Sequence, residues 1–213
     1  MKCLLIKNAD VYAPQPLGIV DILIINDKIA KIGQQLAAPQ GLDCQILDAQ
    51  KRKVVPGYVD QHVHIIGGGG ESGPYSRTPE INLSELTKVG ITTVVGVLGT
   101  DGTSRHNESL LAKARGLTHE GITAYMLTGS YEIPLHNMTG DVRRDIILIN
   151  ECLGIGEVAL SDHRSSQPTR EELEKVLTQA RLGGMLSGKA GVVQFHICLL
   201  YTSDAADDRI SVD

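Results

Sequence analysis

Up to about residue 55, the chain alternates apolar and polar residues in short runs that are separated by turn residues. Alternation of this kind predicts β-strands with one buried face. The expected strands cover residues 3–7, 21–25, 28–32, 46–47 and 53–55. Asn26-Asp27 lies between two of these strands and is a hairpin signal. Residues 1–55 are therefore predicted to form a small β-domain.

From residue 56 onward, apolar strands alternate with amphipathic helices. The expected strands cover residues 58–64, 91–98, 122–127, 156–160 and 192–196, and the expected helices cover residues 82–89, 108–119, 142–151 and 170–182. Leu110, Ala114 and Leu117 share one face of the second helix. Thr169 and Glu172 form a capping box at the start of the last. This alternation is typical of a parallel sheet with crossover helices, and it supplies five of the eight units of a (β/α)8 barrel.

Size and charge exclude several classes of function. The 213 residues carry a net charge of −5 and no basic stripe, so we expect no nucleic-acid partner. No apolar run is long enough to span a bilayer, and the first residues do not form a signal peptide, so we expect a cytoplasmic protein without a membrane partner. The four cysteines (Cys3, Cys44, Cys152 and Cys198) have wide, irregular spacing. We expect reduced thiols rather than a disulfide or zinc-ribbon pattern.

Two histidines lie two residues apart in the first expected strand of the second region. They end the run Pro-Gly-Tyr-Val-Asp-Gln-His-Val-His at residues 56–64. Residues two apart in a strand share a face, so His62 and His64 project together toward one point. Neutral imidazole is a common ligand of zinc and related metals, and barrel enzymes keep their chemistry at the carboxyl ends of the strands. The pattern favours a metal site over two ordinary strand histidines.

This run and its continuation carry a resemblance to a known family. Ile-Ile-Gly-Gly-Gly-Gly-Glu follows directly, and Arg-Thr-Pro-Glu follows from residue 77. Together they resemble the first barrel strand of the amidohydrolase superfamily and, within it, the isoaspartyl dipeptidase (β-aspartyl peptidase) family, over about residues 6–196. The resemblance implies a partial (β/α)8 TIM barrel, with strands 1–5 only, at residues 56–197. It also implies that residues 1–55 are part of a small β-sandwich.

The resemblance also implies an activity. The complete enzyme would be a zinc-dependent ω-peptidase and a homo-oligomer with two zinc ions in each complete subunit. It would cleave the β-aspartyl bond of dipeptides with a metal-activated hydroxide. The implied metal ligands are His62, His64, Glu157 and His196. Glu157 stands where the family usually carries a carboxylated lysine, and a carboxylate can also bridge two metals. The alternative is that Glu157 pairs with a lysine outside the site. A charge in an apolar strand is costly unless it is paired or bound to a metal, which favours the bridge.

The substrate residues implied by the resemblance all follow expected strands at their carboxyl ends. Glu71 matches the residue that binds the α-ammonium group of the substrate, and Gly69 matches a backbone contact. Thr100 matches a contact to the aspartyl part of the substrate. Tyr131 matches the phenol that polarises the scissile carbonyl, so Tyr131 and Glu157 are the expected catalytic residues. Arg164 matches a clamp for a carboxylate.

The tail at residues 198–213 resembles translated sequencing-adapter DNA rather than a barrel element. We therefore expect the chain to be an inactive N-terminal fragment of a longer enzyme. Two alternatives for its function stay open. One is another amidohydrolase acting on cyclic amides, such as a hydantoinase or a dihydroorotase, although these lack the glycine-Glu loop paired with Gly-Thr-Asp. The other is a non-catalytic fragment or binding protein on the same scaffold.

Overall fold

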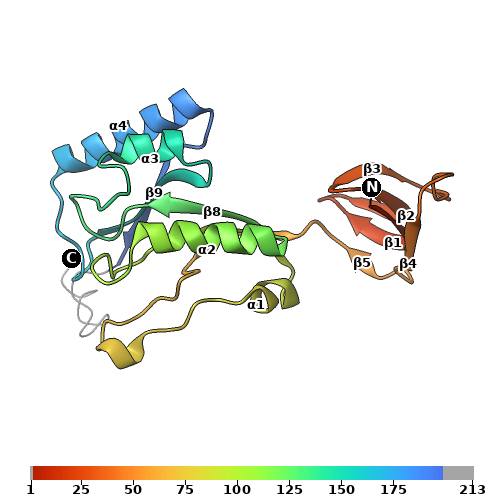
Figure 1. The fold of residues 1–213 in the computed structure, drawn as a ribbon, viewed down its shortest axis with the longest axis horizontal. Helices are drawn as coiled ribbons and strands as arrows, with labels where there is room; N and C mark the ends of the chain where they lie inside the picture. Colours follow the sequence, from red (N-terminus) through yellow and green to blue (C-terminus); the bar gives the residue numbers. More distant parts are fainter. Residues whose placement is uncertain (1, 199–213) are drawn as a thin grey trace, which may run out of the picture. The chain divides into compact units, whose positions relative to one another are not determined.

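The computed structural model describes residues 2–198, and the chain divides into two compact units, Met1–Gly57 and Tyr58–Asp213 (Figure 1). Each unit contains one five-stranded sheet. The predicted adapter-derived tail lies outside the described residues, apart from Cys198. Within the described part of the chain, no helix has the length and apolar character needed to cross a membrane.

The first unit is a β-sheet with a small apolar core. Its strands are β1 (Cys3–Tyr12), β2 (Pro16–Ile25), β3 (Lys28–Gly33), β4 (Cys44–Asp48) and β5 (Lys53–Val54). Their order is β3-β2-β1-β4, and β5 also pairs with β1. Asn26 adopts a φ of 57° in the turn that joins the antiparallel strands β2 and β3, as its turn signal predicts. Ala9, Val11, Val20 and Ile22 form the core on one side of this sheet.

Two cysteines of the first unit form a disulfide, so the expectation of reduced thiols is wrong for this pair. Cys3 and Cys44 are joined, although 41 residues separate them in the sequence. They lie directly opposite each other in the parallel pairing of β1 with β4, with their Cα atoms 4.4 Å apart. That separation is within the range that a disulfide spans. The spacing of the cysteines in the sequence did not indicate this disulfide, because only the parallel register of β1 with β4 brings the two residues together.

The second unit is a curled parallel half-barrel. Its strands are β6 (Tyr58–Val63), β7 (Ile91–Gly96), β8 (Thr123–Thr128), β9 (Cys152–Leu160) and β10 (Val192–Ile197). Its helices are η1 (Pro74–Ser76), α1 (Leu83–Lys88), α2 (Asn107–Glu120), α3 (Val142–Leu148) and α4 (Arg170–Ser187). The strands follow one another in sequence order, and every neighbouring pair is parallel. The expected fold, a partial barrel with a separate small β-domain, is confirmed.

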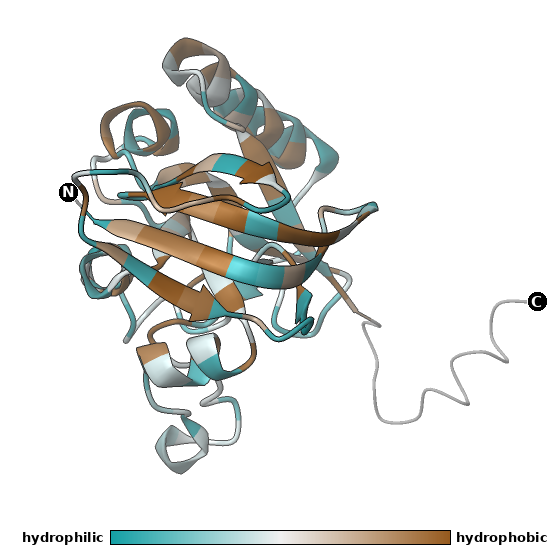
Figure 2. Ribbon diagram, turned by 90° about the vertical axis from the view of Figure 1, so that its right-hand side faces the viewer, coloured by the Kyte–Doolittle hydropathy of each residue, from teal (hydrophilic) through white to brown (hydrophobic). Residues whose placement is uncertain are grey.

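Side chains on successive residues of the half-barrel strands point to opposite faces. Val94 belongs to the core between the sheet and the helices, while Val95 belongs to the cluster on the other face with Leu127. The ribbon coloured by hydropathy shows hydrophobic residues concentrated in the strands and hydrophilic residues in many connecting loops (Figure 2). The two faces of the half-barrel sheet therefore contact different apolar clusters.

The fourth barrel strand is longer than its sequence pattern predicts. Helix α3 ends at Leu148, because Ile149 leaves the helical conformation with φ −105° and ψ 112°. Lys189 reaches over from the end of α4 and donates to the carbonyl of Ile146 at 2.6 Å. Strand β9 then begins at Cys152, four residues before the expected start at Gly156. Glu157 lies inside this strand, at a register shift between Ile155 and Val158, which both pair with β10.

Candidate functional site

The end of β6 and the glycine loop that follows it bring His62 and His64 to the carboxyl edge of the sheet. The two imidazole rings lie edge to face, with centroids 5.4 Å apart. Gly99 follows β7 with φ +81°, and a Cβ atom there would lie 2.5 Å from Cε1 of His64. Glycine is therefore required at this point for the ring of His64 to approach the neighbouring loop. Burial lowers the pKa of His64, which favours the neutral imidazole that binds metals.

Glu157 lies between two sets of histidines. It is almost fully buried, with 1 % of its surface exposed. Its Oε2 atom lies 3.2 Å from Nε2 of His62 and 3.9 Å from Nε2 of His64. Its Oε1 atom lies 2.7 Å from Nδ1 of His196, which comes from β10. One carboxylate oxygen therefore faces His62 and His64, and the other faces His196.

The donor set fits a divalent metal such as zinc. His62, His64 and Glu157 offer ligand atoms that all lie within 4.8 Å of one another. Oε2 of Glu157 is buried and accepts no hydrogen bond, which is costly for a carboxylate oxygen unless a cation satisfies it. On the other side, Nδ1 of His196 lies 2.7 Å from Oε1 of Glu157. Both atoms carry lone pairs, so a proton or a cation must lie between them. Imidazole nitrogen and carboxylate oxygen are both common zinc ligands.

Tyr131 follows β8 and points toward the same centre. Its phenol is buried, and its oxygen lies 3.1 Å from Nδ1 of His196. Burial raises the pKa of Tyr131, and the negative charge of Glu157 raises it further. The phenol therefore keeps its proton at neutral pH and can donate a hydrogen bond to an oxygen in the site.

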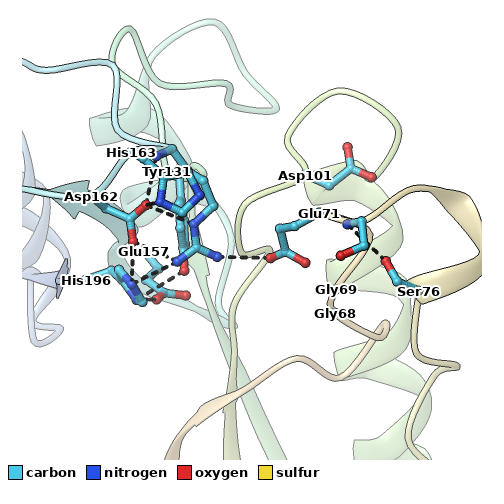
Figure 3. Close-up of polar contacts among 12 residues, drawn as sticks. Gly68, Gly69, Glu71, Ser76, Asp101, Tyr131, Glu157, Asp162, His163 and His196 are labelled. Carbon is cyan, nitrogen blue, oxygen red and sulfur yellow. Dashed lines mark hydrogen bonds and ion pairs between the residues drawn. The ribbon is translucent and has the colours of Figure 1, made fainter. Parts of the chain in front are cut away.

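A pocket lies beside the histidine cluster. Its volume is about 340 Å3, and it is lined by Gly69, Gly70, Glu71, Thr100, Asp101, His163 and Arg164. Nη1 of Arg164 lies 3.0 Å from Oε1 of Glu71, so a cation and an anion stand side by side in this pocket. Figure 3 shows Glu71 pointing toward the group that contains Glu157 and His196. The arrangement can bind one positive and one negative group of a small molecule.

The structure brings the predicted site residues into two adjoining groups. The proposed metal ligands His62, His64 and His196 all lie beside the carboxylate of Glu157, and Tyr131 contacts His196. The proposed substrate residues Gly69, Glu71, Thr100 and Arg164 line the pocket.

The sequence reasoning missed two buried charged residues beside these groups, and one of them, Asp162, contacts both groups. Asp162 is fully buried, and its Oδ2 atom lies 2.7 Å from Nη2 of Arg164 and 3.1 Å from Nε2 of His196. Hydrogen bonds from Arg164 lower the pKa of Asp162 well below its usual range. Arg105 is buried beneath the glycine loop, and it donates to the carbonyls of Gly68 and Gly69 at 2.8 and 3.0 Å. The sequence argument that drew attention to Glu157 was a charged residue in an apolar strand. Asp162 follows the same strand, so a similar argument could have identified it.

Arg105 is expected to hold the glycine loop in its conformation. Arg105→Ala removes two charge-assisted hydrogen bonds to buried carbonyls, which should cost the loop about 2 kcal/mol of local stability. We expect faster hydrogen exchange at the amide of Gly68, which donates to Oγ1 of Thr78 at 2.7 Å. Arg115→Ala is the matched control, because Arg115 is exposed and, within residues 2–198, pairs with Glu151 alone. Equal exchange rates at Gly68 in the two variants would contradict this role.

Comparisons with known proteins identify the family that this site resembles. No protein-family model matches the chain. The β-aspartyl dipeptidase of Fervidobacterium islandicum AW-1 is 45% identical in its solved structure, which superposes with a TM-score of 0.88 over 92% of this chain and 53% of that chain. The same enzyme in complex with the β-Asp-Leu dipeptide gives a TM-score of 0.87. The chain thus spans about half the length of these relatives.

Curated sequences give shorter matches within one superfamily. Dihydroorotase of Staphylococcus aureus is 39% identical over 90 residues, 42% of this chain and 20% of that protein. Imidazolonepropionase of Psychromonas ingrahamii is 27% identical over 119 residues, 54% of this chain and 30% of that protein. The half-barrel and the matches together confirm the resemblance to the amidohydrolase superfamily. Within that superfamily, the family that the chain resembles is the isoaspartyl (β-aspartyl) dipeptidases.

Proposed function

We propose that the complete protein is a metal-dependent hydrolase that cleaves the β-aspartyl bond of dipeptides. One observation carries the proposal: a histidine-Glu157 cluster adjoins a pocket that presents Glu71 and Arg164 side by side. A β-aspartyl dipeptide carries an α-ammonium group and free carboxylates around one amide bond. The pocket offers a partner of the right charge for both kinds of group, next to the atoms that would act on the amide.

Two zinc ions in each complete subunit are the proposed cofactor. His62, His64, Glu157 and His196 would hold them, as the donor set and the unsatisfied oxygen of Glu157 indicate. Zinc bound in such a site lowers the pKa of a water molecule and polarises a carbonyl. The bridging role of Glu157 would need no carbon dioxide, in contrast to a carboxylated lysine.

The chain's own residues bind and orient the dipeptide in this proposal. Glu71 accepts from the α-ammonium group, and the planar guanidinium of Arg164 binds a carboxylate. Gly69 and Thr100 line the same pocket and supply polar contacts to the aspartyl part. Tyr131 keeps its proton because of burial and donates to the carbonyl oxygen as negative charge develops there.

The 213-residue chain alone is expected to bind zinc and the dipeptide but not to cleave the dipeptide. In the family, a histidine from strand six and a proton-shuttling aspartate from strand eight complete the site. The five described barrel strands do not include either of these strands. Binding and catalysis should therefore separate in experiments with this chain.

A cyclic-amide hydrolase is the second candidate function. The match to dihydroorotase, at 39% identity over 90 residues, favours it. The paired charges of Glu71 and Arg164 argue against it, because they suit a substrate with a free ammonium group and a free carboxylate. A test of function should therefore include a cyclic amide.

Reconstitution of a complete barrel tests the proposal. We would co-express the chain with the part of the Fervidobacterium β-aspartyl dipeptidase that the chain does not cover, and assay the purified complex with zinc. Release of leucine is expected from β-Asp-Leu but not from α-Asp-Leu, and the chain alone should release none. Hydrolysis of dihydroorotate instead would favour the second candidate. A complex that forms and binds zinc but leaves β-Asp-Leu intact would refute the proposal.

A further inference from the structure

Asp162 contacts both groups of the candidate site. It follows β9 directly, and its side chain is fully buried. Arg164 donates to it three times: from its backbone N–H to Oδ1 at 2.8 Å, from Nε to Oδ1 at 2.9 Å and from Nη2 to Oδ2 at 2.7 Å. On the other side, Oδ2 lies 3.1 Å from Nε2 of His196. Figure 3 shows Asp162 next to His196, with Glu157 close by.

These contacts define which nitrogen of His196 carries the proton. A neutral imidazole has one donor nitrogen and one acceptor nitrogen. Each nitrogen faces a carboxylate that can only accept, Oδ2 of Asp162 at 3.1 Å from Nε2 and Oε1 of Glu157 at 2.7 Å from Nδ1. When a cation occupies the side of Nδ1 and Glu157, Nε2 is therefore the donor. Arg164 also lies 3.3 Å from Nε2, but the guanidinium can only donate, so it cannot take the place of Asp162 as the acceptor. Nδ1 is then left with its lone pair, and this nitrogen faces Glu157 and Tyr131.

We propose that Asp162 is a positioning residue that fixes the tautomer and ring orientation of His196 and, with the same carboxylate, the guanidinium of Arg164. This inference rests on the proposed function, which gives His196 and Arg164 their roles. Asp162 would thereby couple the carboxylate clamp in the pocket to a ligand of the metal centre. Carboxylates that accept from the second nitrogen of a ligand histidine orient the ring and raise its basicity.

Direct binding of a metal by Asp162 is the main alternative. Ligand atoms of Asp162, His196 and Cys198 lie within 4.8 Å of one another. Both oxygens of Asp162, however, already accept charge-assisted hydrogen bonds from Arg164. A cation bound there would have to displace the guanidinium or stand beside its positive charge. The contacts therefore favour positioning over ligation.

Two measurements on the 213-residue chain test the inference. The first is the nitrogen-15 NMR signature of His196 in the zinc-loaded wild-type chain, assigned with His196→Gln. The second is zinc affinity, measured by competition with a chromophoric chelator, for the wild-type chain and Asp162→Asn. Loss of such a carboxylate typically weakens metal binding by about 10–100-fold, and we expect a loss in that range. The effect should vanish in a His196→Ala background.

Asp145→Asn is the matched control, because Asp145 is equally buried on the same unit but contacts neither His196 nor Arg164. We expect Asp145→Asn to keep wild-type zinc affinity below its unfolding temperature. An Nδ1–H tautomer of His196 in the zinc-loaded wild-type chain would overturn the inference even if Asp162→Asn failed to fold. Wild-type zinc affinity in Asp162→Asn, or an equal loss in Asp145→Asn, would also overturn it. Neither measurement uses hydrolysis, so a failure to cleave β-Asp-Leu would refute the proposed function alone.

Discussion

Glu157→Ala should remove zinc from the chain almost completely. Zinc sites of about four ligands bind with roughly 10–16 kcal/mol, so one ligand is worth about 3 kcal/mol, or about 100-fold in affinity. Glu157 faces His62 and His64 with one oxygen and His196 with the other. Its removal should therefore weaken both halves of the centre. Equilibrium dialysis with metal analysis, at a free zinc concentration about ten times the wild-type dissociation constant, measures the bound ions per chain.

Two controls separate the bridge from a general loss of charge. Glu151→Ala removes a carboxylate from the residue just before β9, where Glu151 pairs with the exposed Arg115. That variant should bind zinc as the wild-type chain does. Added bicarbonate should not restore zinc to Glu157→Ala, because alanine cannot form a carbamate. If Glu157→Ala keeps the same zinc content as Glu151→Ala, then Glu157 is not the bridge.

Local patterns in the sequence predict most of the half-barrel. The alternation of strands with amphipathic helices follows from burial of one face of each element, which short stretches of sequence determine. The predicted strands and helices of the second unit therefore all occur, and the pairing of β2 with β3 follows from the turn at Asn26. The two-residue period of a strand predicts that His62 and His64 project toward a common point. Their rings do lie 5.4 Å apart, although β6 ends at Val63 and His64 belongs to the loop.

Contacts between distant strands could not be predicted in the same way. The disulfide between Cys3 and Cys44 depends on the register of β1 with β4, which no local pattern specifies. The contact of Asp162 with His196 depends in turn on the pairing of β9 with β10, whose register shifts between Val193 and Phe195. The family resemblance, rather than periodicity, gave the ligand roles of Glu157 and His196. Residues that position other residues, such as Asp162 and Arg105, emerge only when the strand order places them beside their partners.

The second large effect concerns stability: Asp145→Ala should destabilise the second unit by about 3 kcal/mol, because it leaves four donors without an acceptor, one in a buried contact and three in part-buried contacts. Asp145 is fully buried in the first turn of α3. It accepts from Oγ1 of Thr128 at 2.6 Å, from the amide of Met138 at 3.0 Å, and from the amide and Oγ1 of Thr139 at 2.9 and 2.7 Å. These bonds tie the end of β8 to the loop before α3.

Asp141→Ala provides the comparison on the same helix. Asp141 is the N-cap of α3, and its side chain accepts from the amides of Arg143 and Arg144. Loss of an N-cap costs about 1 kcal/mol. Urea unfolding of both variants, followed by circular dichroism, should therefore give a clearly lower midpoint for Asp145→Ala. Equal midpoints would show that the Asp145 network contributes no more than a cap.

The same variant separates stability from the chemistry of the site. Asp145 anchors Thr128, which precedes Tyr131 by three residues, but it contacts none of the proposed metal ligands. Below its unfolding transition, Asp145→Ala should therefore bind zinc like the wild-type chain, whereas Glu157→Ala should lose zinc while it is still folded. Zinc loss that tracks unfolding in both variants would mean that the histidine cluster depends on the whole unit rather than on Glu157.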